Sequence, residues 1–184
     1  MKKLLLAIAL VATLMGVTSC LKNGVEDEYK TWRKLNEAWF EEQAMLQDES
    51  GKLYYEKVVA PWDPNAKVLV HWFNDTTLTK DNLKPLYTST VDVKYHGRLI
   101  DDTPFDSSYV STSPADSVTR FTINQTIEGW GIAMPRMHVG DSCRIVVSYQ
   151  QAYGTYSIGD VILPYSVLQF DVKLVDIHKY EVKE

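Results

Sequence analysis

The sequence predicts an α+β fold, in which mostly antiparallel strands surround one short helix and an amphipathic helix precedes them. From residue 53 onward, apolar residues recur at every second position in several segments, which is the period of a half-buried strand. Between residues 20 and 52 apolar residues instead recur at helical spacing. No internal repeat and no long linker interrupts the chain, so we expect one domain with an N-terminal helical arm.

The first 19 residues have the features of an export signal. Lys2 and Lys3 form a short basic region, and residues 4–17 are almost wholly apolar, a run shorter than the about 20 residues that a membrane helix needs. Small residues then precede Cys20, which is similar to a bacterial lipoprotein signal, in which that cysteine becomes the lipidated first residue of the mature chain. A plain secretory signal with a coincidental cysteine is the alternative. Because Leu21 rather than an aspartate follows Cys20, we expect an outer-membrane location.

Composition limits the partners of the mature chain. Removal of residues 1–19 leaves 165 of the 184 residues, and the loss of Lys2 and Lys3 changes the formal charge from −5 to −7. An acidic protein of this kind is a poor candidate for binding nucleic acid. Lipidation of Cys20 would leave Cys143 without a disulfide partner, and its alternating apolar surroundings predict a small buried side chain rather than a reactive thiol.

Residues 20–52 are expected to form a lipidated tether followed by an amphipathic helix of about 20 residues. Its apolar positions are Val25, Tyr29, Trp32, Leu35, Trp39 and Leu46. An acidic run at residues 26–28 suits the positive N-terminal end of a helix, and residues 48–51 are expected to end it. We expect the two tryptophans to pack against the domain; a partner-binding or dimer surface through Trp32 and Trp39 is the alternative.

The rest of the chain divides into a β extension, residues 53–85, and a core, residues 86–184. Strands are expected in the extension at residues 53–59 and 67–73, with a loop at 74–85. In the core, strands are expected at residues 86–96, 142–149 and 167–178, because apolar residues alternate with polar ones in each. A short helix is expected to begin near Ile127 and to end early at Pro135, since proline cannot continue a helix.

Five fragments of the core resemble, in order and spacing, the FKBP-type peptidyl-prolyl isomerases. They are Val91-Asp92-Val93-Lys94-Tyr95-His96-Gly97-Arg98-Leu99, Phe105-Asp106-Ser107-Ser108, Ile127-Glu128-Gly129-Trp130, Ala152-Tyr153-Gly154, and Ile162-Leu163-Pro164 leading into Leu168-Gln169-Phe170-Asp171-Val172. The resemblance covers about the last hundred residues. It implies a twisted antiparallel sheet wrapped on a short helix, isomerisation of X-Pro bonds in peptide segments of exported proteins, and no cofactor or metal.

The resemblance also implies a role for each matched residue. Trp130 would form the floor under the proline ring, with Tyr95, Phe105 and Phe170 as walls and Ile127 and Ile162 at the rim. Phe121 would be a further wall. The Ile127 N–H and the Tyr153 hydroxyl would each hold a substrate carbonyl. Asp106 would lie at the pocket edge and hydrogen-bond either the Tyr95 hydroxyl or the substrate.

Some features leave the activity open. Taken singly, Tyr95, Phe121 and Phe170 could be core residues of strands, and residues 105–108 could be a turn. Asp102 stands where the family usually has glycine, although aspartate tolerates a positive φ, and Leu163 replaces an expected proline. The four histidines have no metal-ligand spacing. We therefore predict a lipid-anchored prolyl isomerase, with a binding or chaperone module that has lost turnover as the alternative.

Overall fold

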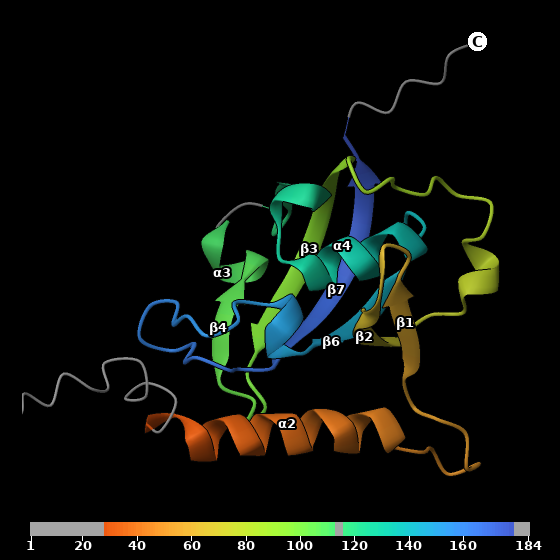
Figure 1. The fold of residues 1–184 in the computed structure, drawn as a ribbon. Helices are drawn as coiled ribbons and strands as arrows, with labels where there is room; N and C mark the ends of the chain where they lie inside the picture. The colour runs from red at the N-terminus through yellow and green to blue at the C-terminus, as the bar shows by residue number, and fades with distance from the viewer. Residues whose placement is uncertain (1–27, 113–115, 179–184) are drawn as a thin grey trace, which may run out of the picture.

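The structure is a computed structural model, and it describes residues 28–112 and 116–178. Within them the strands form one antiparallel sheet of seven members in the order β1-β2-β6-β7-β3-β4, with β5 paired to β3. Figure 1 shows the short helix α4 against one face of the sheet and the long helix α2 running across the strand ends. The predicted α+β class is confirmed. The signal segment and Cys20 lie outside the described residues.

The strands differ in length: β2, β3 and β7 are the longest, and β4 and β5 are the shortest. Their bounds are β1 Glu56–Ala60, β2 Asp63–Trp72, β3 Thr90–Arg98, β4 Pro104–Ser107, β5 Thr119–Thr122, β6 Ser142–Val147 and β7 Leu168–Ile177. The helices are α2 Lys30–Met45, α3 Ser108–Ser111 and α4 Glu128–Ala133. Single 3-10 turns are η1 Thr76–Leu78, η2 Ile123–Gln125, η3 Met134–Arg136 and η4 Tyr149–Gln151.

Five strands lie within a few residues of their predicted positions, and two strands were not predicted. Strand β2 begins before its predicted start because Ala60 pairs with Asp63, so β1 and β2 form a tight hairpin that includes Pro64. Strands β4 and β5 have four residues each, too few for an alternating pattern to be recognised. Both pair with β3 and thereby place Asp106 and Phe121 beside it.

The main core lies between the sheet and α4. Gly129 makes this close packing possible, because a Cβ on it would lie 2.4 Å from Val147 Cγ1. Helix α4 ends at Ala133, and Pro135 falls in the 3-10 turn that follows, as the sequence predicts. The chain then returns Met137 to the core, where it is fully buried. Cys143 is buried as well, and burial raises the pKa of its thiol, in keeping with an unreactive side chain.

A second, smaller core lies between α2 and the opposite face of the sheet. It contains Phe40, Tyr55, Leu69, Val146 and Val167, with Trp39 packed against it. The expectation that α2 packs on the domain is therefore confirmed. Its predicted apolar stripe was wrong at Leu35, which is 54% exposed, whereas Asn36 is fully buried. Among the described residues, no helix has the length and apolarity needed to cross a bilayer.

Asp141 is a buried carboxylate that joins the loop at residues 74–82 to the start of β6. It is fully buried, and it accepts hydrogen bonds from Asn74 Nδ2 at 3.0 Å, Thr79 Oγ1 at 2.5 Å and the His138 N–H at 2.7 Å. Burial alone would raise the pKa of Asp141, but the donors from Thr79, His138 and Asn74 outweigh it, so the pKa is lowered.

This lowered pKa predicts an acid-sensitive contribution to stability. Because the folded pKa of Asp141 lies below the unfolded value of about 3.9, the stabilisation is complete above that pH and is lost as the pH falls toward the folded pKa. Asp141→Asn should cost about 1–3 kcal/mol at pH 7. Between pH 5 and pH 3, the urea midpoint of Asp141→Asn should then fall less than the midpoint of the parent. The fall in the midpoint of Thr79→Val should lie between these two. Parallel midpoint curves for parent and Asp141→Asn would contradict this assignment.

Candidate active site

A cavity of about 390 Å³ opens beside α4, and the sheet and the loops around it supply its walls. Most of the residues that the sequence predicts for a proline pocket line this cavity. The lining residues are Tyr95, Asp106, Phe121, Gln125, Thr126, Ile127, Trp130, Tyr153 and Phe170. They come from β3, β4, β5, α4 and β7 and from the connections between them, so the cavity forms only when these elements are assembled.

Trp130 is the centre of an aromatic cluster at the base of this cavity. Its ring centroid lies 5.4 Å from that of Tyr95, 5.5 Å from Phe121 and 5.4 Å from Phe170, and in each pair the rings meet edge to face. This geometry is favourable because the positive edge of one ring meets the negative face of another. Trp130 is 4% exposed. The cluster therefore offers an apolar floor whose rings hold one another in place.

Asp106 is hydrogen-bonded to the tyrosine at the cavity wall. Tyr95 Oη donates to Asp106 Oδ2 at 2.6 Å, which is the first of the two partners expected for this carboxylate. Burial raises the pKa of Tyr95, and the hydrogen bond to Asp106 raises it further. The Tyr95 hydroxyl thus stays protonated, and Asp106 remains beside the cavity with acceptor capacity for a ligand.

Tyr153 reaches the cavity from the loop that follows η4. Burial raises the pKa of its hydroxyl, and the negative charge of Asp106 raises it further, so the group stays a neutral donor. Ile127 also lines the cavity. It is the N-cap residue of α4, so its N–H precedes the hydrogen-bond ladder of that helix. Tyr153 and Ile127 therefore both lie beside the aromatic floor.

Phe105 and Ile162, predicted for the wall and the rim, line a hollow of about 310 Å³ that adjoins the aromatic cavity. This hollow shares Asp106, Tyr153 and Phe170 with the aromatic cavity. Phe105 meets Phe170 edge to face at 5.5 Å, and Gly97 leaves room for it, since a Cβ there would lie 2.6 Å from Phe105 Cε2. Phe105 thus packs against Phe170, which lines both the cavity and the hollow.

Gln125 and Thr126 also line the cavity, although none of the five sequence fragments contains them. They directly precede Ile127, and their place just before a helix that carries the floor is the signal that could have identified them. Asp102 is the turn residue that replaces glycine, and it adopts a φ of 64°, as aspartate can. In the part of the chain that the structure describes, no group of three or more His, Cys, Asp or Glu residues could hold a metal ion.

The sequence pattern of the FKBP-type peptidyl-prolyl cis-trans isomerases matches residues 82–175, about half of the chain. The chain belongs to this FKBP family. The resemblance predicted from the five fragments is confirmed, and every residue lining the aromatic cavity falls inside the matched segment. Helix α2 and strands β1 and β2 lie outside it.

Curated relatives share this FKBP segment. The macrophage infectivity potentiator of Trypanosoma cruzi is 42% identical over 93 residues, which cover 50% of this chain and 45% of that protein. The FKBP-type 22 kDa peptidyl-prolyl cis-trans isomerase of Escherichia coli is 40% identical over 93 residues, or 50% and 43% of the two chains. Outer membrane protein MIP of Legionella longbeachae is 38% identical over 96 residues, or 52% and 40%. The chain thus spans less than half of the length of these relatives.

Solved structures extend the likeness to the fold of most of the chain. A peptidyl-prolyl cis-trans isomerase from Pseudomonas syringae gives a TM-score of 0.57 at 23% identity, covering 87% of this chain and 98% of that one. FkpA from Escherichia coli gives a TM-score of 0.63 at 22% identity, covering 83% of this chain and 63% of that one. At this identity the likeness shows the FKBP-like fold alone.

Proposed function

We propose that this chain is a peptidyl-prolyl cis-trans isomerase that assists the folding of exported proteins at the bacterial cell envelope. The aromatic cavity carries the proposal, because it combines a ring floor at Trp130 with donors at Ile127 and Tyr153. Family membership and the names of the relatives, which include an isomerase of Escherichia coli, support the same reaction class. The substrate would be an X-Pro bond in an unfolded or partly folded segment.

The reaction needs little from a protein beyond such a cavity. Rotation about an X-Pro bond interrupts amide resonance, at a barrier of roughly 18–20 kcal/mol, and takes tens to hundreds of seconds without a catalyst. A site that prefers the twisted amide to the planar one lowers this barrier. The apolar floor would hold the proline ring away from water, and the two donors would bind carbonyl groups of the twisted segment. A 10⁴-fold acceleration corresponds to about 5.4 kcal/mol.

The test is cis/trans kinetics on a proline peptide, measured by a protease-coupled assay or by NMR exchange with residues 21–184. Tyr153→Phe should lower kcat/KM about two- to tenfold, because one hydrogen bond to the substrate is lost. Asp106→Val should lower it about tenfold or more, because the Tyr95 hydroxyl loses its buried acceptor. Circular dichroism and thermal melting must show that both variants fold. A well-folded parent that binds the peptide without accelerating exchange would refute the isomerase.

Lipid attachment through Cys20 is the proposed route to the envelope, and the outer membrane is the proposed location. The basic and apolar residues before Cys20 support it, and the relative from Legionella longbeachae is named as an outer membrane protein. Full-length parent should partition into detergent and incorporate labelled palmitate, whereas Cys20→Ala should do neither. Equal partitioning and labelling of the two proteins would remove the lipid anchor from the proposal.

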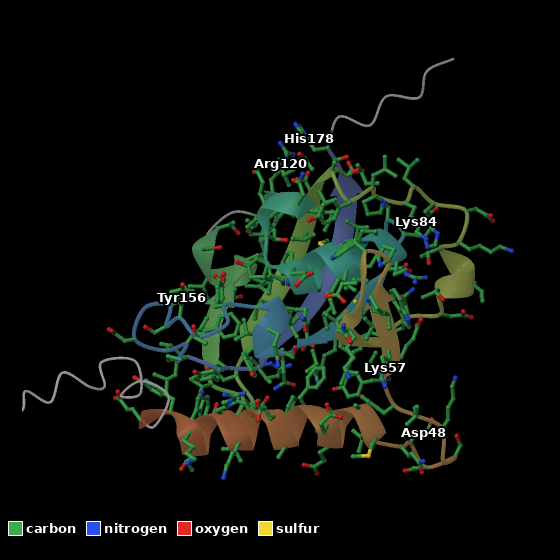
Figure 2. The ribbon with its side chains drawn as sticks, viewed as in Figure 1. Asp48, Lys57, Lys84, Arg120, Tyr156 and His178 are labelled. Atoms are coloured by element: carbon green, nitrogen blue, oxygen red, sulfur yellow. The ribbon has the colours of Figure 1, made fainter. Side chains whose placement is uncertain are left out.

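A binding module without turnover is the second candidate, and the surface beside the cavity favours it. Tyr109, Val110, Tyr156 and Ile158 expose 54%, 78%, 75% and 44% of their surface. Figure 2 shows Tyr156 on the loop between η4 and β7, pointing outward at the side of the domain that carries β4. Such side chains could hold an apolar segment without catalysis. Suppressed aggregation of a proline-free unfolded protein, together with no isomerisation, would support this candidate over the first.

A further inference from the structure

Helix α2 contacts both ends of the segment that carries Tyr153. This segment begins with Tyr149 in η4, passes along the rim of the aromatic cavity, and returns to the sheet at Val167, one residue before β7. Figure 1 shows the blue loop of this segment lying over the N-terminal half of α2. Helix α2 lies outside the residues matched by the family pattern, so these contacts join an element outside that segment to the loop that carries Tyr153.

The C-terminal end of the segment is hydrogen-bonded to two side chains of α2. Asn36 is fully buried, and its Oδ1 accepts the Val167 N–H at 2.8 Å while its Nδ2 donates to the Trp32 carbonyl at 2.9 Å. Trp32 Nε1 donates to Ser166 Oγ at 3.1 Å, and that hydroxyl donates to the Leu163 carbonyl at 2.7 Å. A buried asparagine with both functional groups paired is costly to replace and fixes the backbone that it meets.

The N-terminal end of the segment is held by the ion pair Arg33–Glu37, whose residues directly follow Trp32 and Asn36 in α2. Tyr149 Oη donates to Glu37 Oε1 at 3.2 Å, and Arg33 Nε lies 2.9 Å from the same oxygen. The Arg33 guanidinium lies 5.0 Å from the ring centroid of Tyr165 and 5.8 Å from that of Tyr149. The two tyrosine rings meet edge to face at 5.3 Å. One side of α2 therefore brings the two ends of the segment together.

Backbone hydrogen bonds connect the two ends of the segment to Gly154, the residue next to Tyr153. The Tyr165 N–H donates to the Gly154 carbonyl at 2.9 Å, and the Gly154 N–H donates to the Tyr149 carbonyl at 2.8 Å. Tyr165 itself adopts a φ of 65°, a conformation that a bulky residue keeps only where its surroundings impose it. Gly154 directly follows Tyr153, so a shift of either end of the segment moves the residue next to the cavity donor.

We propose that α2 positions the segment between Tyr149 and Val167. In this proposal Asn36 and Trp32 are positioning residues that place the Tyr153 hydroxyl over the aromatic floor. The proposal rests on the proposed function for its effect on turnover, and it adds that an element outside the family's matched segment tunes this site. Neither side chain touches the cavity. Their effect on isomerisation must therefore pass through Tyr153.

The test compares Asn36→Leu and Trp32→Phe with Leu35→Ala, a control on the exposed side of the same helix. Asn36→Leu should lower kcat/KM about three- to tenfold and Trp32→Phe about two- to fourfold, as expected for the loss of one or two hydrogen bonds in a well-folded domain. Leu35→Ala should leave it unchanged. In a Tyr153→Phe background, both α2 substitutions should have little further effect, because the group that they position is gone. Full additivity with Tyr153→Phe would overturn the proposal.

Amide hydrogen exchange separates a failure of this proposal from a failure of the proposed function. The Gly154 and Tyr165 amides should exchange faster in Trp32→Phe than in the parent and in Leu35→Ala, whether or not the parent isomerises a peptide. If the parent has no turnover, the proposed function fails while faster exchange still upholds the positioning contact. Unchanged exchange of the Gly154 and Tyr165 amides in Trp32→Phe would overturn the proposal that α2 positions this segment. Trp32→Phe keeps the test usable should Asn36→Leu fail to fold.

Discussion

Trp130→Ala is expected to lower the free energy of unfolding by about 3–5 kcal/mol, the range for removing a large buried aromatic side chain. Trp130 is 4% exposed and meets the rings of Tyr95, Phe121 and Phe170, so its removal leaves a cavity that these rings cannot fill without losing their mutual contacts. The same substitution removes the floor of the proposed proline site, and peptide binding should disappear with it. Urea unfolding at pH 7 measures the first effect, and peptide titration of the folded variant measures the second.

Trp62→Ala is the matched control for this substitution. Trp62 is 50% exposed, lies in the β1–β2 turn, and makes an exposed hydrogen bond from Nε1 to Glu128 Oε1 at 3.1 Å. Its loss should cost less than about 1 kcal/mol. If the two variants unfolded at similar urea concentrations, Trp130 could not be the centre of the core that the structure describes.

Asp171→Ala should be the second large effect, with a loss of about 2–4 kcal/mol. Asp171 on β7 accepts from Arg144 Nε at 2.6 Å and Nη2 at 2.9 Å, and from Arg98 Nη2 at 2.6 Å. The hydrogen bond to Asp171 is the main reason that the pKa of Arg144 is raised. With this carboxylate gone, two partly buried guanidinium groups face each other across the middle of the sheet without their common partner.

Asp102→Asn tests whether the effect of Asp171 depends on its place between the two arginines. Asp102 lies 3.5 Å from Arg98 but its side chain is 76% exposed, so removal of this charge should cost less than about 0.5 kcal/mol. Asparagine also tolerates the positive φ at this position. Thermal melts of the two variants at low and high salt provide the comparison. A similar loss for both would mean that the charge of Asp171, rather than its geometry, matters.

Local pattern and family spacing predicted different parts of this molecule. Alternation predicted the long strands, and motif spacing predicted that Tyr95, Trp130 and Phe170 come together. Neither predicted that Asn36 rather than Leu35 faces the domain, because a polar residue is buried here only through a partner more than a hundred residues away, the Val167 N–H. Hydrophobicity in a single helix contains no such information.

Motif spacing predicted that Phe105 and Ile162 lie at the pocket, but not which part of it they line. Both lie within the matched family segment and line the hollow that shares Asp106, Tyr153 and Phe170 with the aromatic cavity. Loop conformation of this kind depends on contacts such as the Ile158–Ile162 bridge, which joins residues only four positions apart. A spacing rule gives the residue but not the wall that it occupies.

The strand order has a consequence for how the chain reaches its native state. Strand β7 is the last strand along the described chain, yet it lies in the interior of the sheet between β6 and β3, and it carries Phe170 of the aromatic cavity. Strand β3 can therefore join the rest of the sheet only after β7 has been made, and pairings between residues so distant in the chain slow folding. A nascent chain that stops before Leu168 lacks the strand that joins β6 to β3 and lacks Phe170 of the aromatic cavity. Until β7 has paired, a molecule therefore lacks the proposed isomerase site and has no such site with which to act on its own seven prolines.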